Sequence, residues 1–185
     1  MDRRTFLLSL TLLWAPTAHA HTPYRQWRVM RERYLMILSS RTDPESDLLA
    51  ERLAATLQQV LPEANAIVSR APQEERIASL LTTGQVRLAV MSREIALALF
   101  LGDGNFGDYE GKKLRVMLEM DGHLLVTVED FPRHHAWLVT SALAEHSEGL
   151  TVRVPDNGDA KSGAGIPTHR GALGYLRGEP LGAQE

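Results

Sequence analysis

Serine, threonine and arginine side chains recur in three short turns, each directly after an apolar run typical of a β-strand. In an open α/β sheet such turns meet at one edge, where helix N-termini favour anions. Hydroxyl and guanidinium groups there could hold a carboxylate or phosphate through charge-assisted hydrogen bonds. We therefore predict a ligand-binding site at Ser39, Ser40, Arg41 and Thr42 in the first turn, Ser69 and Arg70 in the second, and Ser92 and Arg93 in the third. The alternative, in which the serines cap helices and solvent surrounds the arginines, stays open.

The histidines give little support for a metal centre. His134 and His135 are adjacent in a predicted helix, so their side chains point about 100° apart. His146 lies about three helical turns beyond His135, too far away to share an ion with it. The chain has no cysteine, which excludes disulfides, thiolate zinc sites and cysteine nucleophiles. We predict no metal and no cofactor.

Motifs of the common enzyme classes are absent from the sequence. There is no Gly-x-Ser-x-Gly, no Walker loop, no His-Glu-x-x-His and no Gly-x-Gly-x-x-Gly. Glu74 and Glu75 form a carboxylate pair, but they begin a predicted helix, where carboxylates favour the helix dipole and solvent. The sequence thus favours binding over catalysis.

The N-terminus has the pattern of a secretory signal peptide. A basic start is followed by an apolar run over residues 5–14 and by the small-x-small sequence Ala18-His19-Ala20. The run is shorter than the 18–20 apolar residues, roughly, that a membrane anchor needs. Residues 3–7 resemble the twin-arginine export motif, and the general secretory route remains an equal alternative. We predict that residues 1–20 are removed and that the protein is periplasmic.

Composition places the rest of the chain in one globular domain. The 185 residues are 44% hydrophobic with a net charge of −3, and mild acidity argues against nucleic-acid binding. Residues 21–33 interleave arginines with Tyr24, Trp27, Val29 and Met30. They predict a basic arm, either a short helix packed on the domain edge or a segment that binds a membrane or a partner. Residues 34–185 then form a single α/β domain with a flexible loop at 155–165, and no mature segment predicts a membrane span.

Strand and helix patterns alternate through the first half of this domain. Residues 34–39, 66–68 and 86–91 predict buried strands. Each precedes a helix, at 44–61, after Pro72 and after Ser92. Asp43 and Pro44 are typical of a helix start, and Gly84 and Gly102 of helix ends. Strands at 114–120 and 123–128 surround the tight turn Asp121-Gly122, before a helix at 133–146. Short crossover connections predict an open, mainly parallel sheet flanked by helices.

Three fragments in a fixed order resemble one protein family. Residues 86–128 follow the pattern strand, helix, glycine-phenylalanine loop, strand, strand. Residues 135–146 form a helix with an aromatic, a threonine, Ala-Leu and Glu-His in order. Residues 166–175 are similar to the motif Ile-Pro-Leu-His-Pro-Gly-Ala-x-x-Tyr. Together they resemble the TAXI family of solute receptors of TRAP transporters, over roughly residues 34–176. The resemblance implies a single lobe of a type 2 periplasmic binding protein, a small carboxylate or amino-acid solute and TRAP membrane subunits as partners.

The chain departs from that family where the ligand would bind. Family receptors have a second lobe, whereas here Phe131-Pro132 leads directly into the late helix. Residues 39–43 and 72–76 replace small, glycine-containing family turns, and Met91 stands where glutamine is common. We therefore expect an exported solute-binding-like protein. The alternative is a degenerate single lobe, an accessory or sensory protein that binds another periplasmic protein.

Overall fold

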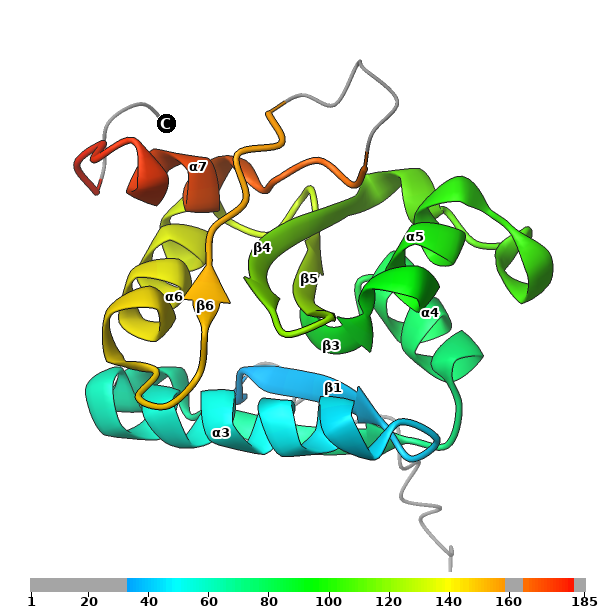
Figure 1. Ribbon diagram of the computed structural model, residues 1–185, viewed down its shortest axis with the longest axis horizontal. Helices are drawn as coiled ribbons and strands as arrows, with labels where there is room; N and C mark the ends of the chain where they lie inside the picture. The colour runs from blue at the N-terminus through cyan, green and yellow to red at the C-terminus, as the bar shows by residue number, and fades with distance from the viewer. Residues whose placement is uncertain (1–32, 159–164, 182–185) are drawn as a thin grey trace, which may run out of the picture.

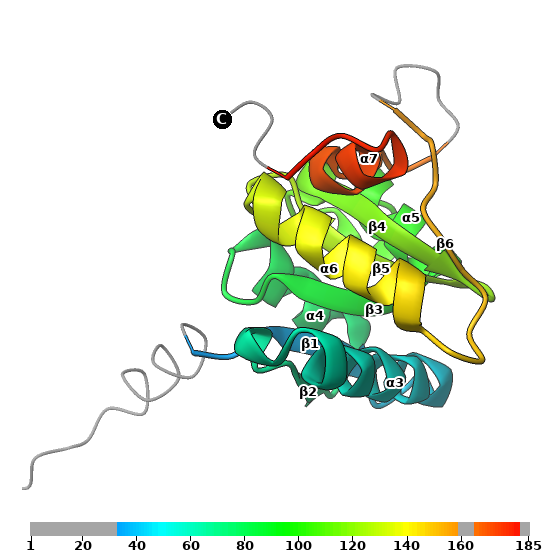
Figure 2. The same cartoon turned by 90° about the vertical axis from the view of Figure 1, so that its left-hand side faces the viewer.

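The protein has an α/β fold, built on one open sheet with helices on both faces (Figures 1 and 2). This computed structural model describes residues 33–158 and 165–181. The predicted signal peptide, nearly all of the predicted arm at 21–33 and most of the 155–165 loop lie outside the described residues. No helix in the described part is long and apolar enough to cross a membrane.

The described sheet has six strands and is mixed in direction. Its order is β2 (Ile67–Ala71), β1 (Met36–Ser40), β3 (Leu88–Ser92), β5 (His123–Val128), β4 (Leu114–Met120) and β6 (Val152–Arg153). β1 runs parallel to β2 and β3, whereas the pairings of β5 with β3, of β4 with β5 and of β6 with β4 are antiparallel.

The prediction of a mainly parallel sheet is therefore wrong, although the α/β class and the flanking helices are confirmed. The Asp121-Gly122 turn, with Gly122 at φ 83°, folds β4 and β5 into a hairpin. Because β5 rather than β4 lies beside β3, the hairpin adds a second antiparallel pairing.

The helix α3 (Pro44–Val60) covers one face of the sheet together with α6 (Arg133–His146). It begins as predicted, because the Asp43 carboxylate accepts a hydrogen bond from the Ser46 amide at 3.1 Å. Leu53 and Leu57 are fully buried on its inner face.

On the opposite face lie α4 (Glu74–Thr82) and α5 (Arg93–Leu101). The helix α4 begins two residues after the predicted Pro72. The Ser92 hydroxyl caps α5 by accepting a hydrogen bond from the Ile95 amide at 3.3 Å, and Gly102 ends it at φ 76°.

The last helix, α7 (Arg170–Leu176), packs against α6. A Cβ added at Gly171 would lie 2.3 Å from the Arg133 carbonyl oxygen, so only glycine permits this approach. The Trp137 indole also donates a hydrogen bond to the Glu179 carbonyl at 3.0 Å. These contacts fix the C-terminal segment over the sheet.

Candidate functional site

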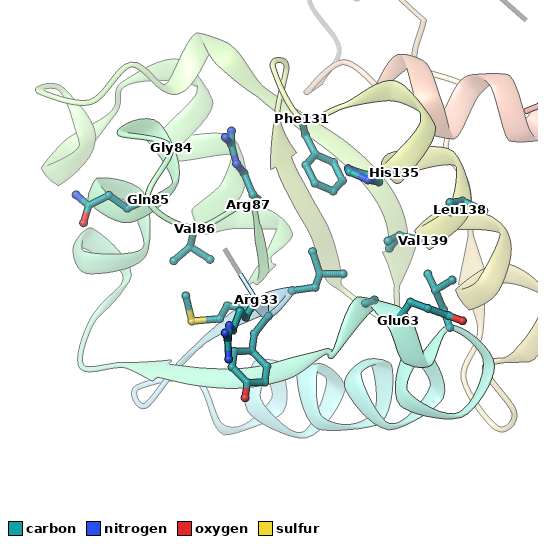
Figure 3. A pocket seen from close by; sticks show the side chains of 15 residues that line it. Arg33, Glu63, Gly84, Gln85, Val86, Arg87, Phe131, His135, Leu138 and Val139 are labelled. Carbon is teal, nitrogen blue, oxygen red and sulfur yellow. The ribbon is translucent and has the colours of Figure 1, made fainter. Parts of the chain in front are cut away.

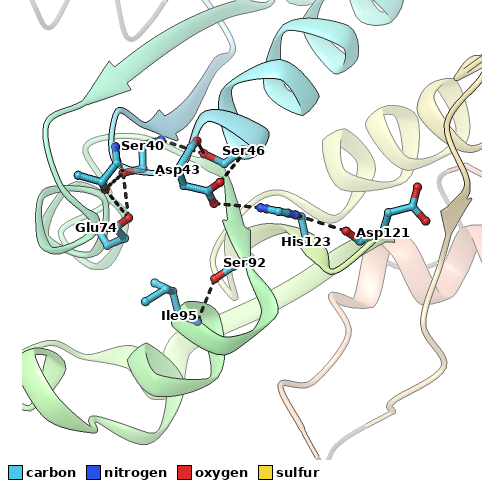
Figure 4. Close-up of polar contacts among 9 residues, drawn as sticks. Ser40, Asp43, Ser46, Glu74, Ser92, Ile95, Asp121 and His123 are labelled. Atoms are coloured by element: carbon cyan, nitrogen blue, oxygen red, sulfur yellow. Dashed lines mark hydrogen bonds and ion pairs between the residues drawn. The ribbon is translucent and has the colours of Figure 1, made fainter.

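The hydroxyl groups of the first predicted turn lie at the edge where β1 and β3 end, and there they donate hydrogen bonds to carboxylates of this protein (Figure 4). Ser39 donates a hydrogen bond to Asp47 at 2.9 Å, and Ser40 donates one to Glu74 at 3.0 Å. Thr42 donates another to the same Glu74 oxygen at 2.6 Å. Ser39 and Ser40 are also buried. These hydroxyls are therefore not free to receive an anionic ligand.

Two of the predicted arginines are held in ion pairs at the same edge. Arg70 pairs with Asp47 at 2.8 Å and with Glu51. Hydrogen bonding to Arg70 lowers the pKa of Asp47 below its ordinary value. Arg93 pairs with Glu119 at 3.1 Å, and Arg153 reaches the other oxygen of that carboxylate.

Arg41 is exposed and makes no ion pair with any described residue, in contrast to Arg70 and Arg93. Ser69 is half-buried on the edge strand β2, and Ser92 caps α5, as the alternative interpretation of the serines predicts.

A buried histidine, which the sequence patterns do not identify, stands among these groups. His123 Nε2 lies 2.9 Å from the Asp43 carboxylate, and Nδ1 lies 3.5 Å from the Asp121 carbonyl oxygen. With both ring nitrogens engaged and Asp43 capping α3, the pair joins the β4–β5 hairpin to the start of that helix. In the sequence, the only sign of this His123–Asp43 pair is the position of Asp43 at a predicted helix start.

The middle of this edge, where β1 and β3 end, carries negative rather than positive charge. Burial acts to raise the pKa of Glu74, but hydrogen bonds from Thr42, from the backbone of Glu74 itself and from Ser40 outweigh it and hold this pKa below its ordinary value. Glu74 is therefore ionised at neutral pH. With Asp43 nearby, it disfavours an anion at the centre of the predicted site.

A cavity lies at the opposite, amino-terminal edge of the parallel strands (Figure 3). Its volume is about 800 Å³, within the range of about 300–1,000 Å³ common for small-molecule sites. Four segments far apart in the sequence line it: residues 33–36 before and at the start of β1, residues 61, 63 and 64 after α3, residues 84–87 before β3, and Phe131, His135, Leu138 and Val139 in and before α6.

The inner walls of the cavity are apolar. Met36, Val86, Phe131 and Val139 are all buried. The Phe131 ring lies 6.2 Å from the His135 ring. Burial, and then the charge of neighbouring His134, lower the pKa of His135 below its usual 6.5, so its ring is neutral at pH 7. An apolar ligand body would thus meet uncharged walls.

Charged groups stand at separate places around this cavity. Figure 3 shows Arg33, Arg87 and Glu63 apart from one another, with Glu63 on the side of Leu138 and Val139. Arg87 lies 3.3 Å from the Asp130 carboxylate, but both side chains are well exposed, so water weakens the pair. A guanidinium has five N–H donors, so Arg87 can also bind a ligand anion.

None of the lining residues belongs to the predicted site. No motif marks them, and most are apolar residues of the kind that fills a core. In the part of the chain that the structure describes, no group of three or more histidine and acidic side chains is arranged to hold a metal ion.

No protein-family model matches the chain, and a search of curated proteins finds no match. The arguments for function therefore come from the two edges of the sheet and from the sequence itself.

Proposed function

We propose that this protein is an exported solute-binding protein that takes its solute in the cavity at the amino-terminal edge of β1 and β3. The observation that carries the proposal is a cavity of ligand size with apolar walls and arginine side chains among its lining residues. Catalysis has no comparable support, because the acid, hydroxyl and imidazole groups of the other edge are bound to one another.

The cavity favours an apolar molecule with one anionic group. Val86, Phe131 and Val139 would contact the apolar body, and Arg87 would bind a carboxylate by charge-assisted hydrogen bonds. Such a solute keeps the carboxylate that the TAXI resemblance implies, and adds an apolar body larger than that of most amino acids.

Membership of the TAXI family remains part of this proposal, supported by the three sequence fragments. The TRAP membrane subunits that the resemblance implies are proposed partners on the same basis. In this protein the solute would bind at the edge opposite the turns on which the site was predicted.

A second candidate is the single-lobe accessory protein that binds another periplasmic protein. Arg41, which is exposed and forms no ion pair within the described part of the chain, lies among paired charges at the carboxyl edge, and this favours it. A partner bearing an exposed carboxylate could pair with Arg41 without disturbing the buried hydrogen bonds.

Titration with decanoate tests the cavity, followed by calorimetry and by NMR chemical shifts. We expect decanoate to bind, decanol to bind more weakly, and shifts to concentrate at residues 84–87 and 131–139. Glutamate serves as the alternative solute: shifts at residues 39–43 and 92–93 on its addition would favour the carboxyl edge instead.

Two variants, each with a matched control, locate the decanoate site. Arg87→Ala should weaken binding about tenfold, the effect of about 1.4 kcal/mol, whereas Arg52→Ala on the exposed face of α3 should not. Leu35→Trp should fill the cavity and block binding, and Leu48→Trp on α3 should leave it intact. Lack of decanoate binding by the unaltered chain, or equal binding by all four variants, would contradict the proposal.

A further inference from the structure

The chain after β6 and the chain before α7 are held together at Asn157. Its backbone amide donates a hydrogen bond to the Thr168 hydroxyl at 3.3 Å, and its side-chain amide donates one to the Ile166 carbonyl at 3.3 Å. The Thr168 hydroxyl in turn donates a hydrogen bond to the Pro155 carbonyl at 2.7 Å. Asn157 therefore links the two segments through both its backbone and its side chain.

The segment that Asn157 holds lies against the sheet. The Val116 amide of β4 donates a hydrogen bond to the Pro167 carbonyl at 2.9 Å, and the His169 amide donates one to the Val116 carbonyl at 2.8 Å. Ile166, which accepts the hydrogen bond from the Asn157 side chain, is 4% exposed. Loss of the link at Asn157 would therefore loosen a buried segment beside β4.

The residue after Asn157 is a glycine, which leaves the asparagine side chain open to attack by the next backbone nitrogen. A glycine has no Cβ to hinder the approach of that nitrogen to the side-chain carbonyl carbon. Gly158 has φ 46°, and apart from its chain neighbours no described atom lies within 4 Å of the place that a Cβ would take. Asn157 is itself exposed, so water reaches the same place.

The chain has three asparagines, and the other two precede bulkier, buried residues. Asn65 precedes Ala66, which is fully buried, and Asn105 precedes Phe106, which is 5% exposed. Both asparagines are exposed, as Asn157 is, so access of water does not distinguish the three. The following residue does.

We propose that Asn157 is a site of spontaneous covalent modification, at which deamidation breaks the link between the chain after β6 and the chain before α7. The Gly158 backbone nitrogen loses its proton and attacks Cγ of Asn157, and the new N–Cγ bond closes a five-membered succinimide. The Cγ–Nδ2 bond breaks, and the amide nitrogen leaves with that proton as ammonia. Water, the co-reactant, then opens the ring to aspartate or isoaspartate. The reaction needs no solute, so it is independent of the proposed function.

Neither product can keep the link as it stands. A carboxylate has no N–H to donate to the Ile166 carbonyl, and its negative charge repels that oxygen. Isoaspartate also adds a carbon atom to the main chain between residues 157 and 158. The two segments should therefore separate more readily after the reaction.

Peptide mapping by mass spectrometry tests the modification, with the three asparagines compared in one sample of the full chain kept in mildly alkaline buffer. We expect Asn157 to convert at least about tenfold faster than Asn65 or Asn105, because only its neighbour lacks a Cβ. Asn157→Gln keeps a side-chain amide but would need a six-membered ring, so this position should stay unmodified. Similar rates at all three asparagines, or no conversion at Asn157, would overturn the proposal.

Hydrogen exchange tests the structural consequence separately. Asn157→Asp reproduces one product, and exchange of the Val116 and His169 amides should become about tenfold faster. Asn105→Asp is the matched control, because it removes an exposed side-chain amide that donates to Glu75 at 2.8 Å, and it should leave both exchange rates unchanged. Equal exchange in the two variants would show that the Asn157 side chain does not hold the segment, and would overturn this part of the proposal.

Discussion

Glu74 is the side chain that determines the character of the carboxyl edge. One of its oxygens accepts hydrogen bonds from both Ser40 and Thr42, and Ser40 is buried. A serine-rich turn can bind an anion only if its hydroxyls lack a nearer acceptor, and here a carboxylate of the neighbouring helix is that acceptor. The same residue types that predict an anion site thus form an internal network.

Replacing Glu74 by glutamine should lower the free energy of unfolding by about 1 kcal/mol at pH 7, because hydrogen bonds to a charged acceptor are stronger than those to a neutral one. The pKa of Glu74 is lowered by folding, so its stabilisation is present above the unfolded pKa of 4.5 and is lost as the pH falls through the folded pKa. Urea unfolding at pH 7 and at pH 3.5 should show the difference between the two proteins shrinking.

Glu148→Gln, at an exposed position after α6, is the matched control and should change little at either pH. A Glu74→Gln variant as stable as the unaltered chain at pH 7 would show that the hydroxyls find equivalent partners.

The helix α3 is the element that connects the two edges of the sheet. Its first residues carry the Asp43 cap and the acidic partners of the carboxyl edge, and Leu61, directly after it, lines the cavity. Between these ends, Leu49, Leu53 and Leu57 pack into the core shared with α6. A shift of this helix would disturb both edges.

Leu53→Ala should lower the free energy of unfolding by about 2–5 kcal/mol, because the side chain is fully buried and the substitution leaves a cavity. Leu48→Ala, on the same helix but 54% exposed, should cost less than about 0.5 kcal/mol. Denaturant titrations of both variants measure the difference. A cost below about 1 kcal/mol for Leu53→Ala would mean that α3 is peripheral to the core.

The sequence predicts where helices and strands begin and end better than it predicts which strands lie side by side in the sheet. Helix and strand ends are marked locally: Asp43-Pro44 begins α3, Gly102 ends α5, and Asp121-Gly122 separates β4 from β5 at the predicted residues. The neighbour of each strand is decided by packing across the whole molecule, so the place of β5 beside β3 has no local signal. The strand β6 has only two residues, too few to show a pattern.

Long-range contacts explain in the same way why the candidate sites were predicted only in part. The rule that strand ends meet at one edge brings Ser40 and Ser92 to the expected place. No local pattern shows that Glu74 or Asp47 would occupy the hydroxyls there. The cavity depends on four segments between residues 33 and 139, and its apolar residues resemble ordinary core residues in sequence.

At the scale of the whole molecule, His169 joins the last helix to the sheet. Its backbone amide donates a hydrogen bond to the Val116 carbonyl of β4 at 2.8 Å, and its Nδ1 accepts one from the Gly171 amide at 3.1 Å. The side chain is 1% exposed, and its ring lies 6.2 Å from that of Phe131, which lines the cavity. Protonation of this ring would therefore disturb the packing of β4, of α7 and of the cavity wall together.

Mild acid should destabilise the fold through His169. Burial lowers its pKa to about 4, aided by Arg170 and Arg115 and opposed by the backbone of Phe131 and Glu129. Between about pH 6.5 and pH 4 this histidine is protonated in the unfolded chain but not in the folded protein. The free energy of unfolding therefore falls as the pH falls through this window. The shift corresponds to about 3 kcal/mol over the whole window, and to about 2 kcal/mol between pH 7.5 and pH 5.

His169→Asn keeps an acceptor for the Gly171 amide but cannot be protonated. Its free energy of unfolding, measured in urea from pH 7.5 to pH 5, should therefore depend much less on pH. His146→Asn removes an exposed histidine at the end of α6 and should retain the full dependence. If His169→Asn lost stability with acid as steeply as the unaltered chain, other groups would control the acid sensitivity of the fold.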